Sequence, residues 1–370
     1  MIKPSNCQLV PTSYSEEDVI VLLKDLTGKM KALNTEEREK LNQSGKHYSE
    51  MLPVEYKPTQ EYLDIFNEIL NINKDKLAKA VSELGNKIVE TYKNKKCLYL
   101  VSFARAGTPI GILLKRYIEN NYDIKIEHYS ISIIRGRGID INAMKFICTN
   151  AGYSPILFID GWIGKGAIQK ELNNFTENYY NYKEMEDSII DKQLYSISDP
   201  GFINDYSHCG TREDFMMPNA CLNATVNGLF SRSVRNELIN HNDFDGAVSY
   251  PDLIKEDLSN KFIDIITDRM NNELALITNI NKDEVLEKIM KDYNIKDINK
   301  VKPGVGETIR VLLRRVPDRI LIQFNQIHSK ELEPIKELCS EKKIPFEVIY
   351  DDSYLGNYKC VGIIKEVSDL

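Results

Sequence analysis

The segment SFARAGTPIG (102–111) carries residue types that bind phosphate groups. Gly107 and Gly111 remove side chains next to a helical pattern, and the exposed amides at a helix N-terminus bind anions. Arg105 adds a planar cation that is suited to phosphate. An ordinary strand-to-helix turn with a solvated arginine explains the same residues equally well, so this segment alone does not decide between the two.

A second segment, DGWIGKGAI (160–168), favours a function more strongly. Its three glycines leave the backbone free to wrap an anion, and Lys165 supplies positive charge. Asp160, at the end of an apolar run, can accept hydrogen bonds from ribose hydroxyls. The segment is not a Walker A loop, because the pattern G-x-x-x-x-G-K-[ST] is absent. A structural turn alone would not need this combination of residues.

A third segment, RGRG (135–138), places two arginines between glycines. A mobile cationic loop of this kind could close over a pyrophosphate group and exclude water. Taken alone, an exposed basic hairpin is the simpler explanation of Arg135 and Arg137. The three segments therefore carry weight only when they are considered together.

The elements around these segments are those of an α/β sheet domain. Short apolar runs at 97–102, 126–134 and 155–160 have the pattern of buried strands, and a helical pattern follows each one. Strands that alternate with helices predict a parallel sheet. The carboxyl ends of such strands meet at one edge, where ligands collect, so we expect the three segments to lie close together.

The chain is long enough for several domains, and its composition can fill real cores, with 42% hydrophobic and 28% charged residues. We expect, in chain order, a helical N-terminal extension (1–94), a sheet domain (95–277) with a hood segment (200–250), a helical linker (278–295) and a small α/β domain (296–370).

Charge and cysteine content limit the choice of partners and compartment. The net charge of −7 argues against binding nucleic acid through overall charge, but between Lys296 and Arg319 seven basic residues stand against three acidic ones. Seven cysteines without C-x-x-C spacing fit a reducing compartment. No signal peptide or membrane-spanning run is evident, so we expect a cytoplasmic protein.

Together the three segments resemble phosphoribosyltransferases. ARAGTP (104–109) is similar to the pyrophosphate-binding loop of the uracil-type members, and ILFIDGWIGKGAI (156–168) stands where that family binds the ribose 5-phosphate. The resemblance implies a Rossmann-like domain, transfer of a pentosyl group, a phosphoribosyl or nucleotide-like ligand, and Mg²⁺ with the pyrophosphate. The sequence departs from the family motif, because Gly161 replaces the second of two adjacent acids and GKGA replaces the threonines.

The same resemblance assigns roles to individual residues. The catalytic residues would be Asp160, Arg105, Arg135 and Arg137. Phosphate and ribose contacts would come from Ser102, Ala106, Gly107, Thr108, Gly161, Gly164, Lys165, Gly166 and Ala167. In the hood segment, the rest of the substrate would meet Thr211, Arg212, Asp214, Asn219, Asn223 and Arg232.

A closer resemblance spans nearly the whole chain. SFARAGTPIGILLKR, HYSISIIRGRGID and CGTREDFMMPNACLNATVNGLFSRSV are similar to the phosphoribosyltransferase-like family of bacterial tellurite-resistance and stress operons. Some members of that family carry the label cysteine protease StiP. Three functions therefore stay open: a phosphoribosyltransferase-type enzyme, a non-catalytic regulator that binds RNA or a nucleotide, and a cysteine hydrolase.

A cysteine hydrolase needs a thiolate, a histidine that takes its proton and a group that orients the histidine. Cys209 and Cys221 are the candidate nucleophiles, although a buried, inert cysteine is the commoner interpretation of either. Adjacent side chains such as those of His208 and Cys209 usually diverge, so His128 or His241 could serve as the base instead.

The C-terminal part resembles the pelota/L7Ae RNA-binding domain through KPGVGETIRVLLRRVP (302–317). That resemblance implies structured RNA as a partner. The candidate RNA contacts are Gly304, Gly306, Glu307, Thr308, Arg310 and Arg314. A solvated helix face is the alternative, and base stacking is not indicated, because no aromatic RNP motif is present.

Overall fold

The computed structural model describes residues 1–4, 7–270, 285–351 and 353–365. Its main feature is a central sheet of six strands in the order β1-β6-β5-β9-β10-β11, in which every neighbouring pair is parallel. The strands are β1 (Ile20–Val21), β5 (Cys97–Phe103), β6 (Lys125–Ile131), β9 (Ile156–Trp162), β10 (Ile190–Ser198) and β11 (Cys209–Thr211). The predicted α/β class with a parallel sheet is confirmed.

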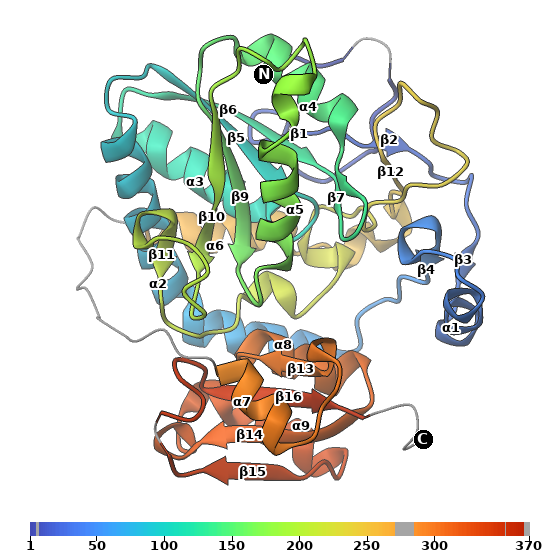
Figure 1. The fold of residues 1–370 in the computed structure, drawn as a ribbon, viewed down its shortest axis with the longest axis vertical. Helices are drawn as coiled ribbons and strands as arrows, with labels where there is room; N and C mark the ends of the chain where they lie inside the picture. Colours follow the sequence, from blue (N-terminus) through green and yellow to red (C-terminus); the bar gives the residue numbers. More distant parts are fainter. Residues whose placement is uncertain (5–6, 271–284, 352, 366–370) are drawn as a thin grey trace.

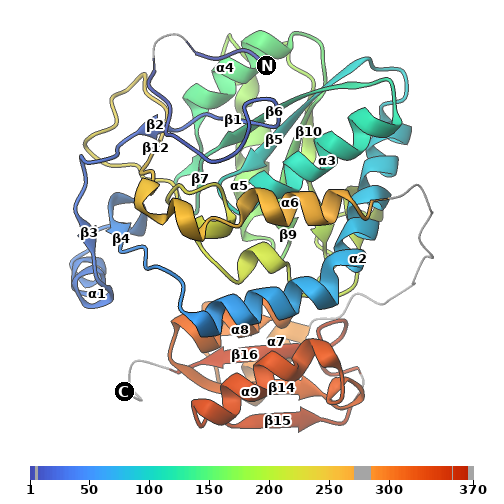
Figure 2. The same cartoon turned by 180° about the vertical axis from the view of Figure 1, so that it is seen from behind.

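Helices cover both faces of this sheet, which explains why its inner strands are buried along nearly their whole length. One face packs against α2 (Gln60–Thr91), α3 (Thr108–Asn121) and α6 (Ser259–Thr267), and the other against α4 (Ile141–Ala151) and α5 (Ala167–Thr176). Figures 1 and 2 show these two layers from opposite sides.

The N-terminal part is helical only in places. It contains α1 (Thr35–Gln43), whose Asn34 cap and Glu37 form a capping box, and all of α2. Residues 19–23 (VIVLL) are buried, three of them are β-branched, and Ile20 and Val21 form β1 at the edge of the central sheet. Three short two-stranded pairs lie outside the central sheet: β2 (Lys24–Asp25) with β12 (Gly246–Ala247), β3 (Ala32–Leu33) with β4 (Leu52–Pro53), and β7 (Ile133–Ile134) with β8 (Gly138–Ile139).

The C-terminal unit is a four-stranded sheet with helices, docked below the sheet domain in Figure 1. Its strand order is β13-β16-β14-β15, formed by β13 (Val301–Pro303), β14 (Pro317–Gln323), β15 (Phe346–Ile349) and β16 (Cys360–Ile364). The helices are α7 (Val285–Asp292), α8 (Val305–Arg314) and α9 (Glu333–Glu341).

The two units share one apolar core. Buried residues of α8, among them Val305 and Ile309, belong to the same cluster as Phe66 and Ile69 of α2. Figure 2 shows α2 running along the C-terminal unit and then up the sheet domain. Among the helices of the described residues, none is long and apolar enough to cross a membrane.

Candidate active site

The first two glycine-rich segments meet at the carboxyl edge of the central sheet. A Cβ atom on Gly107 would lie 2.8 Å from the backbone oxygen of Ile159, so only glycine permits this approach of the two strands. A Cβ atom on Gly161 would lie 3.9 Å from the backbone oxygen of Ala106. The parallel topology thus brings these two segments together, as the sequence predicted.

Arg105, however, is engaged inside the protein. Its guanidinium donates hydrogen bonds to the carbonyl of Phe230 at 3.0 Å and to the Asn223 side chain at 3.1 Å. It also lies 3.5 Å from the carboxylate of Glu55. The guanidinium therefore connects the hood segment to the N-terminal part.

Lys165 points away from Arg105 and into the C-terminal unit. Its ammonium donates to the carbonyls of Ile298 at 2.5 Å and Val301 at 3.0 Å. Burial and the neighbouring charge of Lys302 lower the pKa of Lys165 to about 8. The cation of the second segment thus helps to hold the two units together.

The rest of the second segment is also packed. Burial raises the pKa of Asp160 to about 6, while the amide of Gly161 donates to this carboxylate at 2.7 Å. Trp162 lies between Gly164 and Gly304. A Cβ atom added to either glycine would come within about 3.4 Å of the indole ring. Gly166 has a φ of 76°, and Ala167 begins α5.

The remaining strand-end residues of the first segment are buried in a polar network. The hydroxyl of Ser102 and Nε2 of His128 share a hydrogen bond of 2.8 Å, and Nδ1 of His128 lies 2.9 Å from the carbonyl of Asp18. Thr108 pairs with Ser130 at 2.7 Å. Burial lowers the pKa of His128 to about 3, and both ring nitrogens are used, so this histidine does not serve either candidate cysteine.

The arginines of the third segment lie on the β7–β8 hairpin. Arg137 donates to the carbonyl of Arg235 at 3.0 Å and forms an ion pair with Glu50. Arg135 is exposed, and its amide donates to the hydroxyl of Tyr48 at 2.9 Å. These contacts hold the hairpin against the N-terminal part, and the amide of Gly136 donates to Glu171 of α5 at 2.7 Å.

Several hood residues form internal contacts. Arg212 forms a buried ion pair with Asp199 and stacks on Phe202, with 4.6 Å between its guanidinium carbon and the ring centroid. Asn219 donates to the carbonyl of Ala106 at 3.0 Å. The amide of Glu213 donates to the Thr211 hydroxyl. The guanidinium of Arg232 donates to the carbonyls of Tyr48 and Met51.

Asp214 reaches from the hood segment to the N-terminus of α8. Its carboxylate accepts hydrogen bonds from the amide of Val305 at 3.1 Å and from the amide of Lys359 at 2.9 Å. A Cβ atom on Gly304, whose φ is 90°, would lie 2.8 Å from this carboxylate. The helix end that the sequence assigned to RNA is therefore occupied by a carboxylate of the same chain.

The other candidate RNA residues lie along α8. Glu307 pairs with Arg310 at 3.0 Å, and Thr308 is buried. Gly306 has open space around it. The side chain of Arg314 lies outside the described residues.

The two candidate nucleophiles differ sharply in their surroundings. Cys221 is buried in the apolar core, with its sulfur 3.8 Å from that of Met216. Cys209, also buried, begins β11, and its thiol points to the carbonyl of Tyr206 at 3.7 Å. Cys209 has charged neighbours of the kind that activate a thiol.

Those neighbours are Lys87 and Arg212. The ammonium of Lys87 donates to the backbone carbonyl of Cys209 at 2.9 Å and lies 3.4 Å from the centroid of the Tyr206 ring. Burial raises the pKa of Cys209 to about 11, and the two cations offset it only in part. The thiol is therefore protonated near neutral pH in this conformation.

His208, the residue before Cys209, contacts groups other than the thiol. Its Nδ1 lies 2.9 Å from the Ser207 hydroxyl, and its Nε2 lies 3.7 Å from the carboxylate of Asp191. Burial alone would raise the pKa of Asp191, but contacts with His208, the Gln193 amide and two tyrosines hold it well below its usual range. An oriented imidazole thus lies one residue from the thiol.

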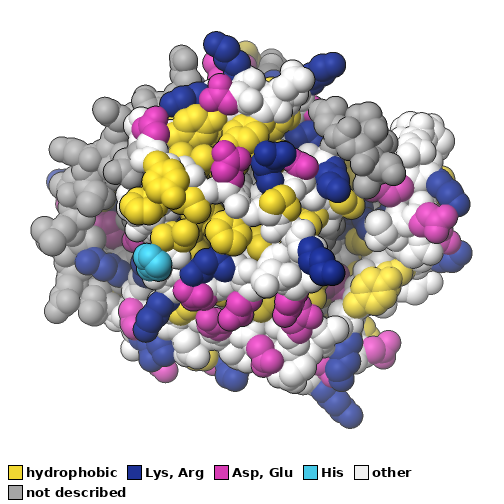
Figure 3. Space-filling view, turned by 90° about the horizontal axis from the view of Figure 1, so that it is seen from below, with side chains coloured by type: hydrophobic (Ala, Val, Ile, Leu, Met, Phe, Trp, Pro, Cys, Tyr) yellow, Lys and Arg dark blue, Asp and Glu magenta, His cyan; other side chains and the backbone are white. Residues whose placement is uncertain are grey.

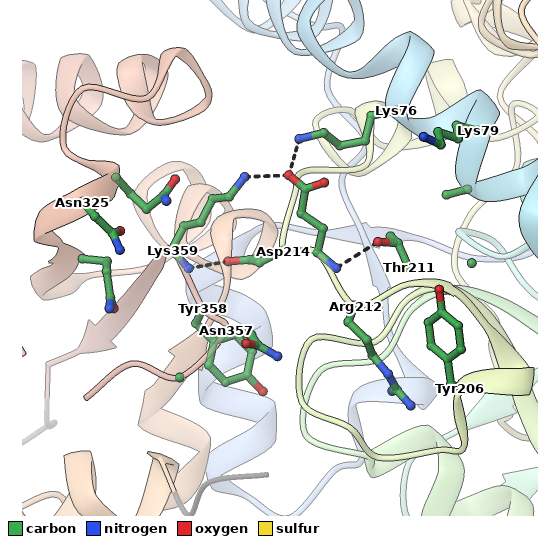
Figure 4. Close-up of a pocket in the computed structure, with 16 residues that line it drawn as sticks. Lys76, Lys79, Tyr206, Thr211, Arg212, Asp214, Asn325, Asn357, Tyr358 and Lys359 are labelled. Atoms are coloured by element: carbon green, nitrogen blue, oxygen red, sulfur yellow. Dashed lines mark hydrogen bonds and ion pairs between the residues drawn. The ribbon is translucent and has the colours of Figure 1, made fainter. Parts of the chain in front are cut away.

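A cavity of about 420 Å³ lies beside this cluster, between the sheet domain and the C-terminal unit. Tyr206 and Arg212 line one wall, and Asn325 and Lys359 line the other (Figure 4). Among the described residues, no group of three or more His, Cys, Asp or Glu side chains is placed to hold a metal ion. Mg²⁺, expected only together with a pyrophosphate, stays a prediction.

Comparisons with known proteins identify the family. The family model described as tellurite-like stress resistance cysteine protease StiP matches residues 12–267, and the PELOTA RNA binding domain model matches residues 280–366. The chain is also 31% identical over 385 residues to cysteine protease StiP of Acinetobacter baylyi (strain ATCC 33305 / BD413 / ADP1), covering 96% of this chain and 94% of that protein. The chain therefore belongs to the StiP family, as the whole-chain resemblance predicted.

These findings correct the main functional expectation. The matched family and the Acinetobacter relative are named as cysteine proteases, so the prediction of a phosphoribosyltransferase that binds phosphoribosyl pyrophosphate was wrong. The engaged side chains of Arg105 and Lys165 give a physical reason, because neither is free to meet a phosphate. The cysteine hydrolase, considered as an alternative, agrees better with the family.

The sequence did not reveal the surroundings of Cys209. Lys87 lies in the middle of a helical pattern, and Asp191 belongs to an acidic, tyrosine-rich stretch that looked like a surface excursion. Neither residue stands in a motif. Only the pairing of β10 with β11 and the course of α2 bring them next to Cys209.

Proposed function

We propose that this chain is a cysteine-dependent hydrolase whose nucleophile is Cys209. The observation that carries the proposal is the placement of this thiol beside Lys87 and Arg212, one residue from the His208–Asp191 pair. Cys221, the other candidate, is packed in the apolar core with its sulfur against that of Met216. The names of the family and of the Acinetobacter relative support the same reaction class.

In the proposed reaction, the Cys209 thiolate attacks a peptide carbonyl, the amine leaves with a proton, and water then hydrolyses the thioester. Lys87 and Arg212 would stabilise the thiolate, and His208, oriented by Asp191, would accept the thiol proton. Both ring nitrogens of His208 face other groups here. We therefore propose that this conformation is a resting form, and that movement of segment 205–208 assembles the pair.

Hydrolysis of fluorescently labelled casein tests the proposal. We expect Cys209→Ala to abolish turnover, by about a thousand-fold or more, because the nucleophile is lost. Cys221→Ala and Cys148→Ala are matched controls, since both replace buried cysteines, and each should keep the activity. Activity that survives Cys209→Ala but is lost in Cys221→Ala would assign the nucleophile to Cys221.

We also propose that the C-terminal unit binds RNA. The match to the PELOTA RNA binding domain and the excess of basic residues between Lys296 and Arg319 support this. Electrophoretic mobility shifts with structured and single-stranded RNA, compared with DNA of the same sequence, test it.

For the sheet domain we propose a phosphoribosyltransferase-like scaffold that lacks the transferase chemistry. What supports it is the meeting of two glycine-rich loops at the carboxyl edge of a parallel sheet. Superposition of an experimental structure on members of that fold would test this assignment.

A further inference from the structure

Two aromatic side chains at one edge of the C-terminal sheet contact each other in solvent. Phe324 follows β14 and Tyr350 follows β15, and because these strands are parallel neighbours, both residues lie at the same edge. Their ring centroids are 4.8 Å apart with 31° between the planes, and the residues are 49% and 74% exposed. Figure 3 shows hydrophobic side chains gathered on the lower face of the molecule. Exposed aromatic surface of this kind is typical of a binding site.

The aromatic pair adjoins the cavity between the two units. Gln323 and Asn325, the residues on either side of Phe324, both line that cavity. Its volume of about 420 Å³ falls in the range of small-molecule sites and is large enough for one nucleotide. The aromatic pair therefore lies next to residues that line an open cavity of suitable size.

The lining of the cavity suits a nucleotide. Asn325, Gln326 and Asn357 line the cavity, and the amide of Asn357 donates to the carbonyl of Pro200 at 3.3 Å. A carboxamide such as that of Gln326 can both donate to and accept from the edges of a base. Lys79, on the opposite wall, is exposed and belongs to none of the ion pairs that the described residues form. An ammonium in this position can meet a phosphate.

We propose that this edge of the C-terminal unit, together with α2, binds an unpaired stretch of RNA. One base stacks on Phe324 and Tyr350, the next nucleotide enters the cavity, and Lys79 contacts the backbone between them. This site is distinct from the N-terminus of α8, where Asp214 already accepts the hydrogen bond of Val305. The inference rests on the proposed RNA binding and adds the part of the RNA that is recognised.

Fluorescence anisotropy with a fluorescein-labelled oligouridylate tests the site. We expect Phe324→Ala and Tyr350→Ala each to weaken binding about ten-fold, because base stacking on an aromatic ring contributes that much. Phe346→Ala is the matched control, since Phe346 is 44% exposed on the same strand but lies at its other end, and it should bind like the unchanged protein. Lys79→Ala should reduce the salt dependence of binding.

Photocrosslinking with 5-iodouridine in the same oligonucleotide gives an independent readout. Crosslinks to Phe324 or Tyr350 support the site. Full binding by both alanine variants, with crosslinks elsewhere, would show that the C-terminal unit binds RNA but not here. If the unchanged protein binds no RNA, the proposed RNA function itself fails. An aromatic edge that binds only a protein would also overturn the inference.

Discussion

Cys209 illustrates how one side chain can have activating neighbours and still be unreactive. Arg212 and Lys87 each lower the pKa of its thiol, but burial has the larger effect. The balance between these effects depends on solvent access, so a small opening of the surrounding turn would change the reactivity strongly. Neither Arg212 nor Lys87 would have to move far for the reactivity of the Cys209 thiol to change.

The pH dependence of alkylation tests this view of Cys209. Because the pKa of the thiol is raised to about 11, the rate of its reaction with iodoacetamide should rise about ten-fold per pH unit from about pH 7 to about pH 10. Mass spectrometry of the peptide that contains Cys209 measures this rate. Lys87→Met should slow it further at each pH, because a neighbouring positive charge is lost. A rate that levels off near neutral pH would contradict the burial of the thiol.

At the scale of single elements, α8 depends on a carboxylate from outside its own domain. Asp214 is only 1% exposed, and burial raises its pKa to about 6 despite the hydrogen bonds from Lys359 and Val305. Between about pH 4 and pH 6 the unfolded chain releases the proton of this carboxyl while the folded protein keeps it. The contribution of Asp214 to stability therefore decreases as the pH rises through this range.

Asp214→Asn tests this contribution. At about pH 4 the variant and the unchanged protein should have similar free energies of unfolding, because the carboxyl is protonated in the folded protein. At about pH 8 the variant should gain up to about 3 kcal/mol relative to the unchanged protein, since it has no charge to bury. Urea denaturation at both pH values measures the difference, and Asp64→Asn, exposed on α2, is the control. A difference that does not change with pH would contradict the raised pKa.

The sequence predicted the inner strands better than the edges and the polar site. The runs at 97–102, 126–134 and 155–160 are mostly apolar and are buried on both faces, and each falls largely on an inner strand of the parallel sheet. The edge strand β1 is only two residues long, and its partner β6 lies more than 100 residues away in the chain. Because such pairing depends on tertiary contacts, no local pattern indicates it.

The side-chain partners were harder to predict for a related reason. Glycine-rich loops at strand ends indicate where a ligand could bind, but not whether a neighbouring carbonyl already accepts the nearby cation. Lys165 donates to Ile298 and Val301 of the other unit, contacts that only the docked arrangement creates. The two glycine-rich segments thus meet at the sheet edge as expected, but the reaction assigned to them was wrong.

At the scale of the whole molecule, ion pairs connect the units around the cavity. Lys359 pairs with Glu213 and Glu331, and Lys76, on α2, pairs with the same two glutamates. Both lysines and Glu331 are largely buried, so water screens these pairs less than it screens exposed ones. We expect this group to fix the position of the C-terminal unit.

Glu331→Ala tests the ion-pair group. Removal of one carboxylate leaves two partly buried lysines with one remaining partner, which should lower the free energy of unfolding by about 2–4 kcal/mol. Hydrogen exchange of the α8 amides measures the accompanying loosening of the domain contact. Glu90→Ala removes an exposed pair with Lys93 and should change stability by less than about 0.5 kcal/mol. Equal effects of the two substitutions would argue against a role for Glu331 in docking.

The length of α2 links the two proposed activities. This single helix of 32 residues extends about 48 Å. It carries Lys76 and Lys79 at the cavity and, two to three turns later, Lys87 next to Cys209. Because α2 is one continuous helix, a shift of its first half on binding of a polynucleotide to the C-terminal unit would also move Lys87 next to the Cys209 thiol. The proposed hydrolase activity would then respond to RNA bound at the C-terminal unit. A truncated chain without that unit would lose this control and would expose the apolar face of α2.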